Sequence, residues 1–177
     1  MNLYRIVSAV FIVLLMSATI YLYVSRTKIV YVRSHDLVEK YQGTIEARME
    51  FDKKKNAMTS NVDSLKLDFE RARNQYVNIA TKLAPAQRME QEKALTQQQG
   101  QLIQYSNAID QKIEEEDAKM MQEVLNQINS FVEKYAQQEG YNIVLGTTLS
   151  GSLLYGDKTI DVTDAMIVEL NNKYKGK

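Results

Sequence analysis

The segment MTSNVDSLKLDFERARNQYVNIATKLAP, residues 58–85, decides the fold. Its apolar side chains recur at steps of 4, 3, 4, 3, 4, 3 and 4 residues, an unbroken heptad pattern of eight positions. A seam of this kind makes a helix supercoil against a partner helix. The sequence therefore predicts one arm of a coiled coil, with the seam residues Met58, Val62, Leu65, Phe69, Ala72, Tyr76, Ile79 and Leu83.

The seam stops at a predicted turn formed by Ala84 and Pro85. Proline cannot continue a helix, but it suits the first turn of the next one. A second apolar pattern then returns for about as many residues as the first arm rises, and a short connection makes matched arms antiparallel neighbours. We predict a helical hairpin over 44–137 with its tip near 83–88, whose returning seam consists of Leu102, Ile109, Ile113, Met120, Val124 and Phe131.

The returning arm is unusually polar for a coiled coil. Residues 97–101 read QQQGQ, and Ser106 and Glu116 occupy seam positions. Polar seam positions lower the stability of a coiled coil. Two interpretations stay open: the glutamines keep an extended helix soluble, or the loose arm is a compliant wall that adapts to different partners.

The composition excludes several classes of protein. The chain has 177 residues, one proline and no cysteine, so disulfides, thiolate metal sites and cysteine nucleophiles are excluded. Lys plus Arg and Asp plus Glu number 22 each, so no basic surface points to nucleic acid.

An apolar segment lies at the N-terminus. Residues 6–25 carry no formal charge, and a helix of that length spans about 30 Å, the thickness of a bilayer core. We expect 1–25 to be a transmembrane anchor or uncleaved signal, although a cleaved signal with Arg5 as its basic region stays open. The best cleavage site, at 17–19, lies inside the apolar run and favours the anchor. Arg26, Lys28 and Arg33 follow the apolar segment, whereas only Arg5 and the α-amino group precede it. Because basic residues favour the cytoplasmic side, this charge bias favours the orientation opposite to export.

Two segments flanking the hairpin predict a small β-rich body over 26–43 and 138–177. Strands are expected over 28–33, 141–145, 152–155 and 158–160, followed by an amphipathic helix capped by Asp161 or Thr163. A body this small, without disulfide or metal, buries a core only marginally. We therefore predict an oligomer whose core is formed by the strand residues Ile29, Val30, Tyr31, Val32, Ile143, Val144, Leu145, Leu153, Leu154, Tyr155 and Ile160.

No catalytic, metal, cofactor or nucleotide site is expected. His35 is the single histidine and lies at a helix start, where a surface role is the usual one. The acidic run 114–117 points in four directions around a helix and is typical of a solvated face. No Gly-rich phosphate loop is present. The fold class is therefore mainly α with a small β body, and the protein is not an enzyme.

The order of these parts resembles the OmpH/Skp family of envelope chaperones. The resemblance rests on IVYV at 29–32, GYNIVL at 140–145, LLY at 153–155 and IDVTD at 160–164, and it spans about 28–175. It implies a homotrimer whose helical arms surround a cavity. It also implies an ATP-independent holdase in the periplasm that binds unfolded outer-membrane β-barrel proteins.

This sequence departs from the familiar members of that family in two ways. Residues 44–134 carry 13 basic and 15 acidic groups, a net charge of −2, whereas those members are strongly basic. The predicted anchor suggests a version tethered to the inner membrane, or a soluble periplasmic one if the segment is cleaved. The alternatives are a tethered structural or adaptor protein that binds a folded partner, and a coiled coil facing the cytoplasm.

Overall fold

The structure, a computed structural model, describes residues 2–24, 26–148 and 153–176. The chain is mainly helical with a small two-stranded β region, which confirms the predicted fold class at this level. In chain order the elements are α1 Asn2–Val24, β1 Ile29–Arg33, α2 Ser34–Lys40, α3 Gln42–Ile79, the 3-10 helix η1 Ala80–Lys82, α4 Pro85–Glu139, β2 Ile143–Thr147, the 3-10 helix η2 Lys158–Ile160 and α5 Thr163–Tyr174.

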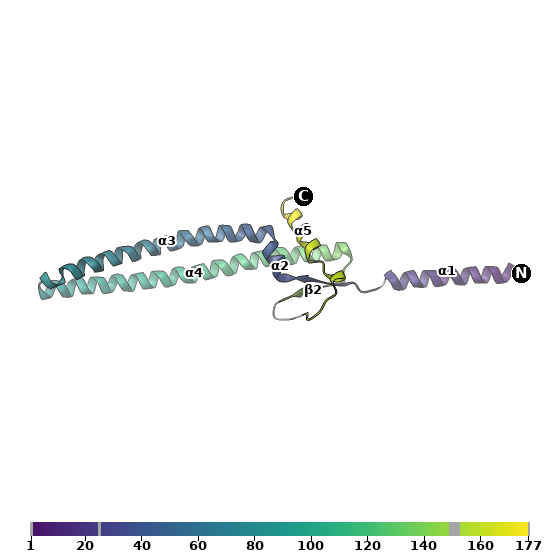
Figure 1. The fold of residues 1–177 in the computed structure, drawn as a ribbon, viewed down its shortest axis with the longest axis horizontal. Helices are drawn as coiled ribbons and strands as arrows, with labels where there is room; N and C mark the ends of the chain where they lie inside the picture. Colours follow the sequence, from purple (N-terminus) through teal and green to yellow (C-terminus); the bar gives the residue numbers. More distant parts are fainter. Residues whose placement is uncertain (1, 25, 149–152, 177) are drawn as a thin grey trace.

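Helices α3 and α4 form a long projection from the body, and they lie side by side along it (Figure 1). The 55 residues of α4 span about 80 Å. At the tip, the 3-10 turn η1 precedes Pro85, the first residue of α4. The side-chain oxygen of Gln87 accepts from the Ala84 N–H at 3.3 Å, and the Arg88 guanidinium donates to the Ala80 carbonyl at 2.8 Å. These bonds satisfy backbone groups that the helix ends leave without partners.

The two strands pair in parallel although the whole α3–α4 projection separates them in sequence. The register runs from Ile29 opposite Ile143 to Arg33 opposite Thr147. On its other side β1 meets the chain again, where Tyr31 bridges Asp161 and its carbonyl accepts from the Val162 N–H at 3.1 Å.

Strand β2 begins two residues later than the predicted 141–145. Helix α4 ends at Gly140, whose φ of 69° places it in the left-handed region that favours glycine. The N–H of Tyr141 still donates to the Ala136 carbonyl at 2.9 Å. Residues 140 and 141 therefore complete the helix cap, and the extended backbone starts only after them.

The prediction of strands over 152–155 and 158–160 is wrong within the described residues. Residues 153–155 are irregular, and Leu154 is 96% and Tyr155 80% exposed. The Asp157 carboxylate accepts from both the N–H and the hydroxyl of Thr159, at 2.8 and 2.7 Å. This local bond competes with strand pairing and turns 158–160 into the 3-10 helix η2.

The buried core lies between α2, the last turns of α4, α5 and the inner face of β1 (Figure 1). Its residues are Val32, Leu37, Tyr41, Val124, Ile128, Phe131, Met166, Ile167 and Leu170. This is the core of a single chain, and the predicted oligomerisation core of strand residues stays a prediction. Val124 and Phe131, which were predicted as seam residues of the arm, are also buried in this core. The body therefore includes part of α4 as well as the segments on either side of the projection.

Helix α1 extends from the end of the body opposite to the projection (Figure 1). Its described side chains are exposed, among them Tyr4 at 86% and Phe11 at 62%. Within the described residues, no helix combines the length and hydropathy needed to cross a bilayer. Residues 1 and 25, at the two ends of the predicted anchor 1–25, lie outside the described residues.

Candidate functional site

The projection has no buried interior along most of its length. Between residues 45 and 123, all of which are described, no side chain is buried. The seam residues within this stretch are half-buried, except Leu65 and Ile79, which are 46% and 43% exposed. The two helices therefore contact each other through a single apolar layer that remains partly exposed to solvent.

The polar contacts between α3 and α4 add little to this layer. Lys54 and Glu116 form an exposed ion pair at 3.7 Å, and the Tyr76 hydroxyl donates to Glu92 near the tip. Exposed ion pairs typically contribute about 0–1 kcal/mol. These polar contacts are thus weak, and the half-buried apolar seam supplies most of the contact between the two arms.

A hollow of about 430 Å³ lies halfway along the arms, and we call it the arm hollow. Tyr105 on its wall is 37% exposed, and two glutamine side chains offer amide donors and acceptors. An apolar surface with polar groups at its rim suits side chains and backbone of a flexible chain. The residues that line the arm hollow are Leu65, Asp68, Phe69, Gln98, Gln101, Leu102 and Tyr105.

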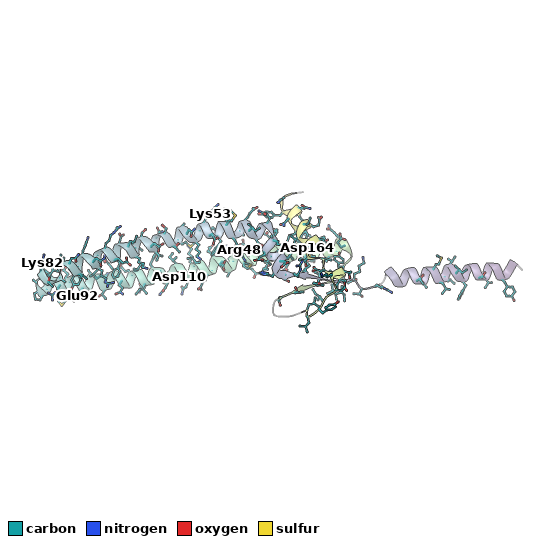
Figure 2. All side chains as sticks on the ribbon, viewed as in Figure 1. Arg48, Lys53, Lys82, Glu92, Asp110 and Asp164 are labelled. Carbon is teal, nitrogen blue, oxygen red and sulfur yellow. The ribbon has the colours of Figure 1, made fainter. Side chains whose placement is uncertain are left out.

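Charges of both signs are spread along the two arms. Lys53 and Lys82 on α3 and its following turn, and Glu92 and Asp110 on α4, show this distribution in Figure 2. The net charge of −2 over 44–134 is therefore the balance of 13 basic and 15 acidic groups, the acidic run 114–117 included. A surface of this kind exerts little long-range attraction on a partner of either sign.

The small sheet has an apolar face turned away from the core, which we call the outer sheet face. Side chains alternate between the two faces of a strand, so Val30 and Val32, 6% and 4% exposed, point inward. Half-buried Val144 packs against the same core. The outer sheet face comprises Ile29, Tyr31, Ile143 and Leu145, of which Ile29 and Ile143 are each 44% and Leu145 42% exposed.

The remaining residues of the predicted oligomerisation core lie in the segment after β2. Leu153 is half-buried, Leu154 and Tyr155 are exposed, and Ile160 is 39% exposed. The Tyr31 hydroxyl donates to the Gly156 carbonyl at 3.3 Å, which brings this segment beside the sheet. The structure thus divides the predicted set between the interior and an exposed apolar surface.

Sequence reasoning missed a charged cluster around Arg33 at the end of β1. Its guanidinium lies 2.8 Å from Asp36, 3.3 Å from Asp161 and 3.2 Å from Asp164. The backbone N–H of Arg33 also donates to the Thr163 hydroxyl at 2.9 Å. This cluster joins β1 and α2 to the start of α5. An arginine at a strand end, followed by acidic residues at two helix starts, was the available signal.

The start of α5 differs in detail from the prediction. The N-cap position is Val162, so neither Asp161 nor Thr163 is the N-cap residue. Asp161 still accepts from the Thr163 N–H at 2.9 Å and from its hydroxyl. The chain turns into the helix through an Asp side chain that bonds two residues ahead.

The response to acid tests the contribution of Asp161. Partial burial raises the pKa of Asp161, but hydrogen bonds from Thr163 and the charge of Arg33 outweigh it, and the pKa lies below its usual value. A depressed carboxyl pKa stabilises the fold above the unfolded pKa, about 3.9, and this contribution is lost as pH falls through the folded pKa. We expect the free energy of unfolding, measured with urea, to decrease as the pH falls over that range. In Asp161→Asn the decrease should be smaller.

The matched control for this measurement is Asp110→Asn, which changes an exposed carboxylate on the arm. It should keep the full acid response of the original chain. Identical acid responses in the original chain and in Asp161→Asn would contradict the assigned role of Asp161.

The family model described as "Outer membrane protein (OmpH-like)" matches residues 28–170. The chain belongs to the OmpH family. The match covers β1, the α3–α4 projection, β2 and most of α5, and the resemblance found in the sequence is therefore confirmed.

A solved structure supports the same fold. The chain is similar to the crystal structure of an outer membrane chaperone (OmpH-like) from Caulobacter crescentus CB15, with a TM-score of 0.61 and 15% sequence identity. The similarity covers 84% of this chain and 86% of the other. A search among curated proteins finds no match.

Membership of the OmpH family settles the broad class of function. OmpH-like chaperones are not enzymes, which confirms the expectation that this chain is not one. The family supports a chaperone role connected with outer membrane proteins, and it implies a periplasmic location.

Proposed function

We propose that the protein is an ATP-independent holdase that binds unfolded outer-membrane β-barrel proteins. The observation that carries this proposal is the pair of long arms without a buried interior between 45 and 123. A holdase needs an accessible, weakly apolar and deformable surface, and no catalytic group. The half-buried seam, the arm hollow and the weak contacts between α3 and α4 supply such a surface.

The holdase would act as an oligomer, and we propose a homotrimer joined through the outer sheet face. Ile29, Ile143 and Leu145 on this face are more than two-fifths exposed, and Leu154 and Tyr155 nearby are more exposed still. Covering these side chains would remove apolar surface from water. Association at the body leaves the arms of the copies projecting together, so that they enclose a cavity for the client.

Client capture in this scheme relies on apolar contacts rather than on charge. The arms carry a net charge of −2 over 44–134, with both signs interspersed. Electrostatic attraction would be screened strongly by salt, whereas apolar burial would not. The proposal needs no membrane attachment, because the arms and the body carry all of its parts.

The direct test is the aggregation of a denatured outer-membrane β-barrel protein diluted from urea. The full chain at equimolar trimer should suppress light scattering without ATP, and moderate salt should change this little. Leu65→Gln combined with Tyr105→Gln should weaken client binding roughly tenfold, because each removes exposed apolar surface from the arm hollow.

The matched control is Leu67→Gln, since Leu67 lies on α3 at 53% exposure but does not line the arm hollow. It should bind clients nearly as the original chain does. Unchanged aggregation in the presence of the full chain would refute the holdase proposal. Equal loss in the double variant and in the control would refute the role of the arm hollow.

A further inference from the structure

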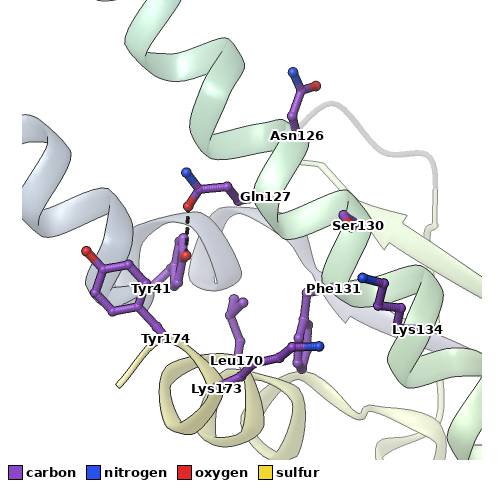
Figure 3. Close-up of a pocket in the computed structure, with 9 residues that line it drawn as sticks. All are labelled: Tyr41, Asn126, Gln127, Ser130, Phe131, Lys134, Leu170, Lys173 and Tyr174. Carbon is purple, nitrogen blue, oxygen red and sulfur yellow. Dashed lines mark hydrogen bonds between the residues drawn. The ribbon is translucent and has the colours of Figure 1, made fainter. Parts of the chain in front are cut away.

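A second cavity, which we call the body pocket, lies where the end of α4, helix α5 and the start of α3 meet (Figure 3). Its volume is about 420 Å³, within the range of small-molecule sites. It is separate from the arm hollow, with which it shares no residue. Its lining residues are Tyr41, Asn126, Gln127, Ser130, Phe131, Lys134, Leu170, Lys173 and Tyr174.

The floor of the body pocket is apolar and fixed in position. Phe131 and Leu170 belong to the buried core, at 9% and 4% exposure. The rings of Tyr41 and Tyr174 meet edge to face at 5.5 Å between centroids. Because packing into the core fixes Phe131, Leu170 and Tyr41, this part of the apolar surface exists before any ligand arrives.

The hydroxyl groups of both tyrosines form hydrogen bonds with side chains that are not part of the pocket floor. The Tyr41 hydroxyl donates to the Gln127 side-chain oxygen at 2.9 Å, as Figure 3 shows. The Tyr174 hydroxyl donates to Glu46 at 2.7 Å, and Gln42 donates to the same carboxylate group at 3.0 Å. Glu46 is thus the nearby acid, held by two donors, and it does not line the pocket.

Two lysine side chains flank this floor, one from α4 and one from α5. Lys173 places its ammonium 5.8 Å from the centroid of the Phe131 ring, and Lys134 lines the same pocket from α4 (Figure 3). No acidic side chain lines the pocket. In the part of the chain that the structure describes, neither ammonium lies within 4.0 Å of a carboxylate. Two ammonium groups therefore flank an apolar surface, and neither is paired with a carboxylate there.

We propose that the body pocket binds a small anionic amphiphile, that is, an aromatic or aliphatic body bearing one carboxylate, sulfonate or phosphate group. The apolar part would lie against Phe131, Leu170 and the tyrosine rings. The anionic group would lie between Lys134 and Lys173, where charge-assisted hydrogen bonds form at the pocket rim. This site is distinct from client capture on the arms and does not depend on the holdase proposal.

The test compares two dyes with almost the same apolar body on the full chain. Anilinonaphthalene sulfonate carries a negative charge, and its parent phenylnaphthylamine carries none. In Lys134→Gln with Lys173→Gln, the dissociation constant of the sulfonate dye at the body pocket should rise roughly tenfold at low salt, because each charge contributes a modest attraction. The constant of the uncharged dye should change less than twofold.

Matched variants separate a charge effect from a loss of structure. Lys112→Gln removes one exposed charge from α4 outside the body pocket, and the dissociation constants of both dyes should stay unchanged. Lys134→Arg with Lys173→Arg keeps the charge and should keep sulfonate binding. Equal weakening of both dyes, or the same effect in Lys112→Gln, would overturn the proposal.

A single introduced tryptophan locates the bound dye, because the natural chain contains none. Gln137→Trp lies on an exposed face of α4 one turn beyond Lys134, and energy transfer from it to the sulfonate dye should be strong. Gln91→Trp lies about 50–65 Å along α4 from the α4 residues that line the body pocket, and it should show no transfer to dye bound there. Transfer that is equal from both positions, or absent from Gln137→Trp, would refute binding in the body pocket.

Discussion

Replacing Met166 by alanine should lower the free energy of unfolding by about 2–5 kcal/mol, the largest stability change that we expect from one substitution. Met166 is fully buried, at 0% exposure, where α5 packs against α2, the end of α4 and β1. Removing its thioether and methylenes loses transfer free energy and leaves a cavity in a small core. Since domains are stable by only about 5–15 kcal/mol, the loss would be a large share of the total.

Urea denaturation followed by circular dichroism measures this change. The control is Met89→Ala near the arm tip, where the same side chain is 70% exposed. That variant should stay within about 0.5 kcal/mol of the original chain. Similar stabilities for the two variants would show that the core is not where the structure places it.

The second large effect concerns association through the outer sheet face. Ile143→Asp combined with Leu145→Asp should abolish the oligomer, because burying two uncompensated carboxylates at an interface costs several kcal/mol. Both side chains are now more than two-fifths exposed, so a single copy should tolerate the change. Light scattering should report a trimer for the original chain, and about one third of that mass for the double variant.

Leu67→Asp is the control for this experiment, since it adds the same charge to an exposed position on the arm. It should retain the oligomer. A monomeric original chain would contradict the proposed trimer. An unchanged mass in the double variant would place the interface elsewhere.

The sequence predicted the long helices well because their signal is local and repeated. The heptad steps from Met58 to Leu83 lie within α3 and the turn that follows it, and Pro85 stands where α4 begins. Gly140 likewise ends α4 in the left-handed conformation that glycine favours. Each of these features depends on neighbours a few residues away, which the sequence shows directly.

The body was harder to predict, because its contacts join distant parts of the chain. Val124 and Phe131 continue the spacing of the arm seam, and periodicity alone could not show that they are buried against α5. The carboxylates around Arg33 come from positions up to 131 residues away. The failed strand over 158–160 had a local cause, the Asp157 side chain, which outweighed the β-branched residues that favour a strand.

The parallel pairing of β1 with β2 sets an order of events during folding. Strand β1 leaves the ribosome early but has no partner until residues 34–142 and then β2 itself have been made. Closing a flexible loop of that length would cost about 4 kcal/mol in chain entropy. If α3 and α4 pair first at the tip and then along their length, their ends at the body bring β1 and β2 together. Most of the entropy cost of loop closure is then already met. Substitutions that weaken the contacts near the tip should therefore slow formation of the body. The rate at which β1 and β2 pair would then depend on how stably the arms pair.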